Sequence, residues 1–435
     1  MRSPRCMGHS GGLDDSVDYI ARIVAAMLNV VVLNGGRGAA TLVPALLDVP
    51  GVRLTSIVNA YDDGKSTGEI RRFFGMLGPS DLRKVQALML PSDGTQQAAC
   101  ALFNHRFAET TSNADALAAL TSFRDGGPLP DGSADLPDRI THVLRDWIAQ
   151  FLDALPLAEV VIGRSFQFAD CAMMNVLYAG AFLANARDME ATVSAVDRLF
   201  RLRGVVLPNS CEDRWLAAER EDGTILLTEA DIVELRSNDR LARLFLLERP
   251  ADAHGLSQLA AGDRARFLAQ RHTPVQLSAG ARLAIEQADA IIYSAGTQHS
   301  SLYPTYMSRG LAACIAGNAG ALKAFVTNIG ADYETPRYRT SDFVNGALRF
   351  LRLGEARRIA TEDLIHVALI NSSRIKSDET YVDDDAENFA DLPLDRIVAN
   401  LESHSSPGKH DGVAITRLIL EQLERREEAR RHDRA

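Results

Sequence analysis

The stretch Val30-Val31-Val32-Leu33, followed directly by Asn34-Gly35-Gly36-Arg37-Gly38, is a continuous apolar run that ends in a glycine loop. Such a run is typical of a strand that is buried on both faces of a parallel sheet. A helical segment follows the loop, and residues 54–60 form the next candidate strand. The order of strand, helix and strand predicts an α/β fold, with a Rossmann-like parallel sheet flanked by helices.

The same pattern returns later in the chain and sets the expected organisation. Apolar runs predict strands at 289–294, 323–328 and 366–371, and helical periodicity predicts helices at 188–203 and 341–353. Turn residues after position 110 indicate an insertion, and polar residues predict a loop over 376–410. We therefore expect a leading helix within 1–28, the first half of a nucleotide-binding core at 29–109, a mostly helical insertion at 110–165, the remainder of the core at 166–423 and a frayed, charged tail at 424–435.

The composition argues against several classes of protein. The chain has 435 residues, with 47 Lys plus Arg against 57 Asp plus Glu, so its net charge of −10 gives no global attraction for nucleic acid or an anionic membrane. Its longest nearly apolar run, residues 23–33, is far shorter than the ~20 residues that span a bilayer. The five cysteines are scattered, which argues against a disulfide framework or a Cys-based zinc site. We expect a soluble cytoplasmic protein.

The glycine loop is the first candidate ligand site. Gly35, Gly36 and Gly38 would let backbone N–H groups approach a phosphate where no Cβ intervenes. The third glycine of a dinucleotide fingerprint is absent, because Thr41 stands in its place. If Thr41 caps the next helix, Pro44 falls in the first turn, where proline is tolerated. A plain turn between strand and helix is the alternative interpretation.

An acidic turn follows the second candidate strand. Asp62 and Asp63 would stand at the carboxyl end of a parallel strand, in the crevice where α/β sheets bind ligands. They could bind Mg²⁺, accept a ribose hydroxyl or act as a base on an attacking alcohol, and a solvated turn is the alternative. The Gly64-Lys65-Ser66 triplet is not a P-loop, because position 59 is asparagine and the segment follows the second strand.

Hydroxyl residues near these loops have both structural and ligand-binding interpretations. Ser66 and Glu69 have the spacing of a capping box, so Ser66 is expected to cap a helix, to contact a ligand or to do both. Ser80 is expected to cap the next helix, where Asp81 would complement the helix dipole.

A second candidate phosphate loop follows the predicted strand at 289–294. Gly296 and Thr297, with Ser300 and Ser301 just beyond, offer backbone N–H groups and hydroxyls to oxyanions. Capping of the following helix is the alternative role of these hydroxyls.

Taken together, these segments resemble the family of the 2-phospho-L-lactate transferases (CofD) and their relatives, the YvcK-type gluconeogenesis factors. The glycine loop is similar to the family's Gly-Gly-Thr-Gly, and the acidic turn is similar to its Asp-Asp-Gly-Gly-Ser-Ser-Gly. Segments that resemble family motifs occur in the family's order at 35–38, 62–68, 79–84, 102–107, 163–175, 203–213, 296–304 and 410–411. No one motif is specific, but their common order is.

Three departures from the family pattern concern the expected pocket. Lys65 and Met174 each replace a glycine, and Arg164 replaces a histidine. Lys65 and Arg164 add positive charge, which would suit a more anionic ligand, or each could form an ion pair with a neighbouring carboxylate. We expect Lys65→Gly to weaken binding of an anionic ligand and to change stability little.

The resemblance implies one of two functions. In the CofD branch, a hydroxyl of a deazaflavin alcohol attacks a nucleotide-activated phospholactate and releases a nucleoside monophosphate, with Mg²⁺ as the candidate cofactor. In the YvcK-type branch, a regulatory protein binds a nucleotide-sugar such as a UDP-sugar without catalysis. Residues 102–107 and the Leu207-Pro208 turn favour the second branch.

The candidate site residues follow from these patterns and from the resemblance. Asp62 and Asp63 are the expected catalytic and metal-binding residues. The residues expected to bind the nucleotide or its phosphates are Gly35, Gly36, Gly38, Lys65, Ser66, Thr67, Asn175, Asn209, Gly296, Thr297, Ser300 and Ser301. The expected partner is a small molecule of the nucleotide diphosphate type, either a nucleotide or a nucleotide-sugar. The oligomeric state stays open, with a homodimer as one candidate.

Overall fold

The computed structural model describes residues 27–36, 38–130, 136–376 and 380–434. The leading helix expected within residues 1–28 lies outside the described residues, apart from Met27 and Leu28. Leu28 already belongs to the first strand.

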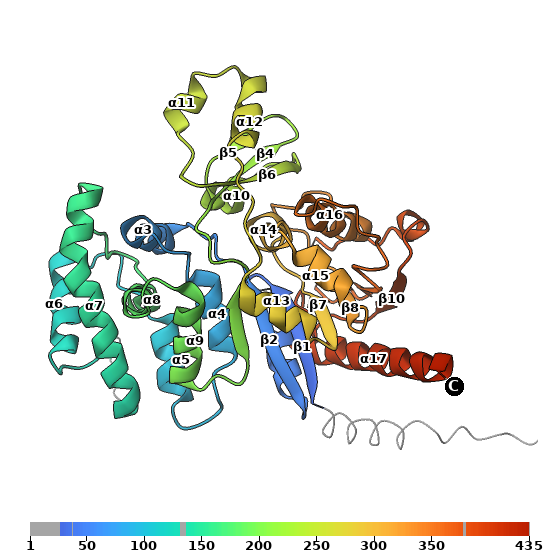
Figure 1. The fold of residues 1–435 in the computed structure, drawn as a ribbon, viewed down its shortest axis with the longest axis horizontal. Helices are drawn as coiled ribbons and strands as arrows, with labels where there is room; N and C mark the ends of the chain where they lie inside the picture. Colours follow the sequence, from blue (N-terminus) through green and yellow to red (C-terminus); the bar gives the residue numbers. More distant parts are fainter. Residues whose placement is uncertain (1–26, 37, 131–135, 377–379, 435) are drawn as a thin grey trace, which may run out of the picture.

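A parallel sheet occupies the centre of the molecule (Figure 1), which confirms the predicted fold class. Within the described residues the sheet has seven strands in the spatial order β10-β9-β8-β7-β1-β2-β3. The strands are β1 Leu28–Asn34, β2 Val52–Val58, β3 Val205–Pro208, β7 Ala290–Tyr293, β8 Leu322–Val326, β9 Val367–Asn371 and β10 Asp395–Ala399. The run of residues 30–33 is at most 1% exposed, because β1 pairs with β2 on one side and β7 on the other.

Two groups of helices flank this sheet. In Figure 1, one group lies beside β2 and β3, and the other lies beside β7 to β10. The first group is α3 Lys65–Phe74, α4 Ser80–Leu88, α5 Gln96–Asn104, α6 Asn113–Arg124, α7 Asp138–Ile162, α8 Met173–Ala184 and α9 Met189–Phe200. The second group is α14 Tyr303–Tyr306, α15 Leu311–Gly317, α16 Thr340–Leu353 and α17 Gly412–Arg434. Two more helices contact the strands of the first side, α2 Leu42–Leu47 on β2 and α13 Ala279–Glu286 on β3.

The segment predicted as a mostly helical insertion, 110–165, contains α6 and α7. Helix α7 buries apolar residues at helical spacing, which are Ile140, Leu144, Trp147, Ile148, Phe151 and Leu155. This face packs on α8, where Gly180 allows the two backbones to approach closely.

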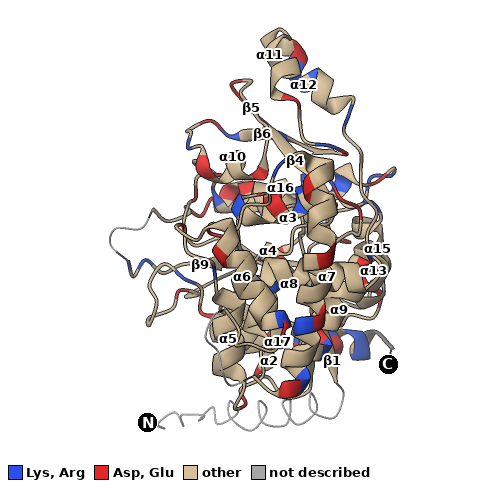
Figure 2. Ribbon diagram, turned by 90° about the vertical axis from the view of Figure 1, so that its left-hand side faces the viewer, with Lys and Arg blue, Asp and Glu red and all other residues tan. Residues whose placement is uncertain are grey.

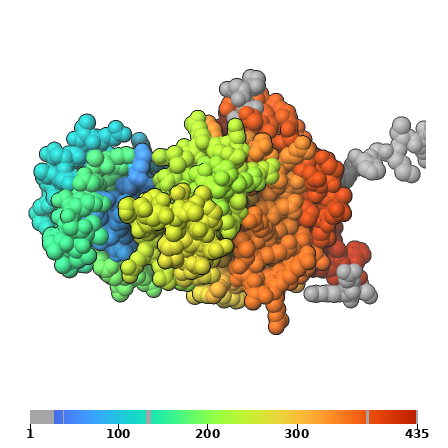
Figure 3. All heavy atoms as spheres, turned by 90° about the horizontal axis from the view of Figure 1, so that it is seen from above, coloured from blue at the N-terminus to red at the C-terminus, as the bar shows by residue number. Residues whose placement is uncertain are grey.

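A second, smaller sheet stands above the carboxyl ends of the central strands. It is antiparallel, in the order β5-β4-β6, with β4 Trp215–Arg220, β5 Ile225–Leu226 and β6 Leu241–Leu247. With α10 Glu229–Glu234, α11 Ala253–Ser257 and α12 Ala261–Ala269 it forms a unit with its own apolar cluster, which we call the cap (residues 215–269). Figure 3 shows the cap from above, as the yellow-green surface between the two helical groups.

The structure corrects two expectations near the C-terminus. The segment 376–410, predicted as a polar loop, contains β10 and a short 3₁₀ helix at Ala386–Phe389. Residues 424–434 continue α17 and do not form a frayed tail, because Arg426 and Arg430 both donate hydrogen bonds to the carbonyl oxygen of Ala319.

Across the described part of the chain, no helix combines the length and the apolar character that crossing a bilayer requires.

Replacing Gly180 with alanine should destabilise the fold. A Cβ at position 180 would lie 1.8 Å from the carbonyl oxygen of Trp147, so α7 and α8 would have to separate. We expect the free energy of unfolding to fall by about 1–3 kcal/mol, the usual cost of overpacking. Gly262 in α12 has no atom within 4 Å of its Cβ position, so Gly262→Ala is the control and should keep or raise the Tm. Thermal unfolding of both variants tests this, and a Gly180→Ala protein of unchanged Tm would contradict it.

Candidate functional site

A cleft of about 740 Å³ lies at the carboxyl ends of the central strands, beneath the cap. The glycine loop after β1, the acidic turn after β2 and the second loop after β7 all contribute to its walls, and α10 of the cap contributes Glu229 and Val233. Three loops that are far apart in the sequence therefore meet at one edge of the sheet, as expected for an α/β protein. Among the predicted ligand-binding residues, those that line the cleft are Gly35, Gly38, Lys65, Ser66, Thr67, Gly296, Thr297, Ser300 and Ser301.

The glycines of the first loop have a packing role. A Cβ on Gly38 would lie 2.1 Å from the carbonyl oxygen of Ala295, and a Cβ on Gly35 would lie 2.2 Å from Cβ of Ser301. Gly36 has a φ of +49°, a left-handed conformation that favours glycine. The first and second loops thus pack backbone to backbone. This contact accounts for Gly35 and Gly38 without a ligand, and both residues also line the cleft.

The two aspartates of the acidic turn face different surroundings. Asp62 lines the cleft, and its Oδ1 accepts a hydrogen bond of 2.9 Å from the backbone N–H of Gly64. Burial and the negative charge of Asp81 raise the pKa of the Asp62 carboxyl. Asp63 is 6% exposed and is absent from the cleft lining, since its Oδ1 accepts a bond of 3.3 Å from the backbone N–H of Ala230 in the cap. Successive residues of an extended turn point in opposite directions, so only one of the pair faces the cleft.

Glu229 is a cleft residue that sequence reasoning missed. It begins α10, and its carboxylate lies over the acidic turn, where Asp62 and Asp81 also line the cleft. Burial and the charges of Asp62 and Asp81 raise the pKa of Glu229 well above its ordinary value. Figure 2 shows acidic residues gathered around α10. No local pattern marks Glu229, because only the position of the cap brings it to the cleft.

Basic side chains from several elements surround the same cleft, and they are Lys65, Arg83, Lys84, Arg106 and Lys409. Most already contact a carboxylate of the protein. Lys65 Nζ lies 3.0 Å from Asp170 Oδ2, and Arg106 Nε lies 2.6 Å from Asp170 Oδ1. Lys84 Nζ lies 2.8 Å from Asp81 Oδ1. A carboxylate between two cations marks a position that suits an anion.

Two predicted helix caps are wrong. Helix α3 begins at Lys65 with Gly64 as its N-cap, so Ser66 lies inside the first turn. The Ser66 hydroxyl accepts hydrogen bonds from the backbone N–H of Ala172 and from Asn175 Nδ2, at 3.3 and 3.1 Å. Helix α4 begins at Ser80 with Pro79 as its N-cap, and Ser80 hydrogen-bonds Asp62 instead.

Lys65 occupies an unusual backbone conformation. Its φ is +46°, in the left-handed region that an L side chain enters at a cost of roughly 1–2 kcal/mol. The side chain is 67% exposed and reaches Asp170 at the rim of the cleft. The ion-pair alternative therefore holds for Lys65, and it also holds for Arg164, whose guanidinium binds both oxygens of Glu69 at 2.6 and 2.7 Å.

In the second loop, a protein carboxylate already occupies the backbone donors. Glu334 accepts hydrogen bonds from the backbone N–H groups of His299 and Ser300, at 2.8 and 2.9 Å, and from the Ser300 hydroxyl at 2.6 Å. Burial raises the pKa of Glu334 to about 7. The sequence predicted Ser300 as a donor to a phosphate, whereas in the structure its N–H and its hydroxyl both donate to Glu334. The Thr297 and Ser301 hydroxyls contact each other at 3.0 Å beside the cleft.

Asn175 and Asn209 lie behind the cleft and do not line it. Both are fully buried. Asn175 supports Ser66 from below, and Asn209 Nδ2 donates to the Ser308 hydroxyl at 3.0 Å. Their side chains position neighbouring loops.

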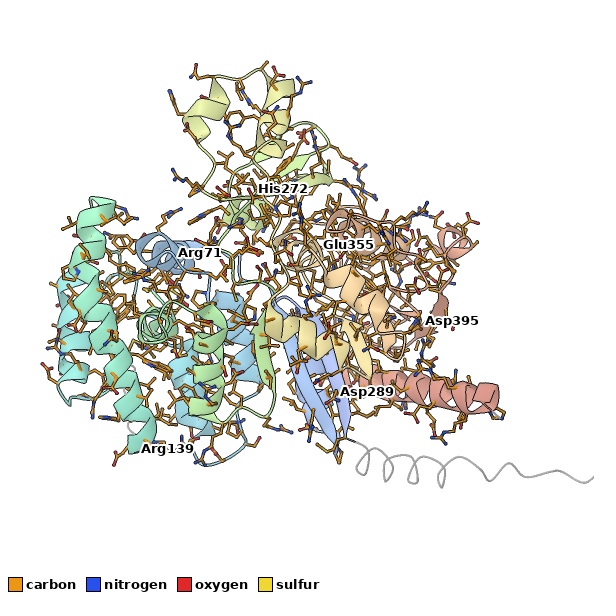
Figure 4. The ribbon with its side chains drawn as sticks, viewed as in Figure 1. Arg71, Arg139, His272, Asp289, Glu355 and Asp395 are labelled. Carbon is orange, nitrogen blue, oxygen red and sulfur yellow. The ribbon has the colours of Figure 1, made fainter. Side chains whose placement is uncertain are left out.

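Arg71 links the acidic turn to the base of the cap. This side chain on α3, labelled in Figure 4, is 1% exposed. Its Nη1 donates to the carbonyl oxygens of Tyr61 and Asp62 at 3.0 and 3.2 Å, and its Nη2 donates to Asp213 Oδ1 at 2.7 Å. The guanidinium carbon lies 4.1 Å from the ring centroid of Trp215, the first residue of β4.

Comparisons with known proteins agree with this architecture. A "Gluconeogenesis factor" of Bacillus subtilis is 23% identical over 405 residues, which are 91% of this chain and 98% of that protein. A "Gluconeogenesis factor" of Halalkalibacterium halodurans is 24% identical over 339 residues, or 78% of this chain and 77% of that protein. A crystal structure of a UPF0052 family protein from Bacillus halodurans has the same fold, with a TM-score of 0.63 at 20% identity, and covers 90% of this chain and 99% of that one.

The family itself is decided by a match that spans most of the sequence. The family described as 2-phospho-L-lactate transferase CofD matches residues 30–405, which include the three loops, the cap and all but the last helix of the core. This chain therefore belongs to the CofD family.

Proposed function

We propose that the cleft binds a small molecule of the nucleotide diphosphate type and transfers a phosphorus-containing group from it to a hydroxyl acceptor. One observation carries the proposal. The glycine loop, the second loop, Asp62 and several basic side chains all line one cleft of about 740 Å³. This volume is within the range of roughly 300–1,000 Å³ typical of small-molecule sites. Membership of the CofD family supports the same class of chemistry.

On this proposal the phosphates lie near the rim formed by Lys65, Arg106 and Asp170. A phosphate that takes the position of the Asp170 carboxylate would receive the charge-assisted hydrogen bonds that Asp170 receives now. The hydroxyls of Ser66 and Thr297, which also line the cleft, are further donors. Transfer of this kind needs positioned donors and an aligned hydroxyl, and no covalent nucleophile.

Asp62 is the proposed base of the reaction. Its carboxylate faces the cleft, and its raised pKa suits it to accept a proton from the attacking hydroxyl. The hydroxyl oxygen forms a bond to the phosphorus of the transferred group, the bridging phosphorus–oxygen bond breaks, and a nucleoside monophosphate leaves. Asp63 is instead a positioning residue, because it accepts from Ala230 and so links the turn to the cap.

Mg²⁺ fits this site as an ion shared with the phosphates of the ligand. Within the described residues, no group of three or more His, Cys, Asp or Glu side chains could hold a metal ion by itself. Asp81 lines the cleft beside Asp62 and would hold the ion together with phosphate oxygens, since Mg²⁺ in nucleotide sites is commonly held by one or two carboxylates and the phosphates. A bound Mg²⁺ would neutralise charge on the transferred group.

A second candidate function is binding of a nucleotide-sugar without catalysis. It is favoured by the relatives named gluconeogenesis factor, which align with most of this chain. The same cleft would serve, and the experiment below separates the two functions.

The first experiment measures binding and turnover side by side. Calorimetry with a UDP-sugar, GDP and a deazaflavin alcohol identifies the ligand class, and release of a nucleoside monophosphate from nucleotide-activated donors reports transfer. We expect Asp62→Asn to lower turnover by about 10²–10⁴-fold, the usual contribution of a general base, while nucleotide affinity changes little. Asp63→Asn is the matched control, and it should lower turnover less than Asp62→Asn does. Tight binding without release of monophosphate by any donor would exclude transfer and leave the regulatory function.

Replacing Lys65 tests the position of the phosphates. We expect Lys65→Gly to weaken nucleotide binding by about tenfold, the effect of losing one charge-assisted contact. The Tm should stay unchanged or rise slightly, because glycine relieves the left-handed φ while the exposed pair with Asp170 contributes at most about 1 kcal/mol.

Lys65→Asn is the control for this experiment, since asparagine tolerates the left-handed conformation and removes the charge. It should lose affinity to the same extent. Unchanged calorimetric affinity in both variants would make Lys65 a partner of Asp170 only and would place the phosphates elsewhere in the cleft.

A further inference from the structure

A cluster of basic side chains with more donors than acceptors lies at the end of the sheet opposite to the cleft. It is formed by Lys323 on β8, His366 just before β9, and Arg426 and Arg430 on α17. Lys323 is 1% exposed, although it is a lysine within a strand. Among the described residues, the Lys323 ammonium forms no hydrogen bond and no ion pair. We call these four residues the basic cluster.

The hydrogen bonds of His366 fix its tautomer. Its Nδ1 lies 3.1 Å from the backbone nitrogen of Lys323, which can only donate, so Nδ1 accepts and the ring proton stands on Nε2. Nε2 lies 3.3 Å from Arg426 Nη2, which is also a donor. Two N–H groups therefore face each other, and neither can accept a hydrogen bond from the other.

Within the part of the chain that the structure describes, the two arginines share a single acceptor. Arg426 Nη2 and Arg430 Nη2 both donate to the carbonyl oxygen of Ala319, at 3.3 and 2.8 Å. Arg426 Nε is buried and has no hydrogen-bond partner among the described residues. Buried donors in native proteins are satisfied as a rule, so unsatisfied donors that converge at one place call for an explanation.

The cluster also repels itself electrostatically. Burial and the charges of Arg426 and Arg430 lower the pKa of Lys323 to about 8, and burial with the charges of Arg426, Lys323 and Arg430 lowers the pKa of His366 to about 3. The negative charge of Asp363 partly offsets this lowering of the Lys323 pKa, but among the described residues Asp363 forms no ion pair with the lysine. An anion at this position would lower the repulsion between the positive charges, and it would also accept hydrogen bonds from the unsatisfied N–H groups.

We infer that the basic cluster is a second ligand site, separate from the cleft, that binds an oxyanion of the phosphate class. Lys323, Arg426 and Arg430 supply the charge, and His366 Nε2–H supplies a neutral directional donor. A phosphate group has several acceptor oxygens and can meet these donors at once, which a chloride ion cannot. The site lies on the same strand as the cleft, because β8 leads directly to Asn328 in the cleft wall.

The experiment follows the side chain of His366 in the whole protein by NMR. Protein labelled at histidine is titrated at constant ionic strength with inorganic phosphate, with glycerol phosphate and with chloride, and His366→Gln assigns the signal. We expect a saturable shift of the His366 nitrogens with both phosphates and none with chloride. The comparison of free phosphate with the monoester shows which source the site prefers. No saturable shift with either phosphate would overturn the inference.

Variants on α17 separate this site from the cleft. Arg426→Gln and Arg430→Gln should each weaken the His366 response by about tenfold, the factor for one lost charge-assisted hydrogen bond. Arg425→Gln is the matched control, because Arg425 is exposed on the same helix, and it should leave the response unchanged. Equal phosphate affinity in all three variants would contradict the inference.

Lys323→Met gives an independent readout from stability. If Lys323 binds an anion, Lys323→Met removes a buried charge that has no partner when the anion is absent. The Tm without phosphate should then rise, and phosphate should no longer raise the Tm of the variant. A fall in Tm with stabilisation by phosphate retained would make Lys323 a packing residue and would overturn its role here. Nucleotide binding in the cleft is measured in parallel, so failure of one site is distinguished from failure of the other.

Discussion

The buried guanidinium of Arg71 determines where the cap stands relative to the sheet. It donates to two carbonyl oxygens of the acidic turn and to Asp213 and the carbonyl oxygen of Arg214, and its flat face lies against Trp215. A planar group with fixed donors can satisfy all of these partners only if turn and cap keep one relative position. The positions of Glu229 and Ala230 over the acidic turn depend on this contact, and the roof of the cleft depends on them.

The parts of the fold that could be predicted are those whose signal is local. Residues 30–33 form a buried central strand because each of them is apolar, and the loop after them is glycine-rich because a Cβ on Gly35 or Gly38 would collide with the second loop. The parts that were missed depend on tertiary contacts. Strand β10 is an edge strand of partly exposed residues that begins with Asp395 and Arg396, so its pairing with β9 decides its conformation. Glu229 reaches the cleft only because the cap folds over the acidic turn.

The three loops that the sequence singles out meet at one edge of the sheet, but the direction of their side chains does not follow from the sequence. The sequence brings the three loops to one edge, but it does not tell which of Asp62 and Asp63 faces inwards, since that depends on the direction of one turn. The sequence also predicts Asn175 and Asn209 as ligand-binding residues, whereas both side chains are fully buried behind the cleft. Lys65, Arg106 and Lys84 are already paired with Asp170 and Asp81, so an anion that bound to these three side chains would exchange partners with the protein.

The Glu334 carboxylate holds the second loop in one conformation in the absence of a ligand. Because Glu334 accepts from His299, from Ser300 and from the Ser300 hydroxyl, the loop is ordered by an internal anion before any ligand arrives. The conformational entropy of that loop is then lost during folding and not during association. The cleft wall formed by Thr297 and Ser301 is thus preorganised, and a ligand would meet it as a rigid surface.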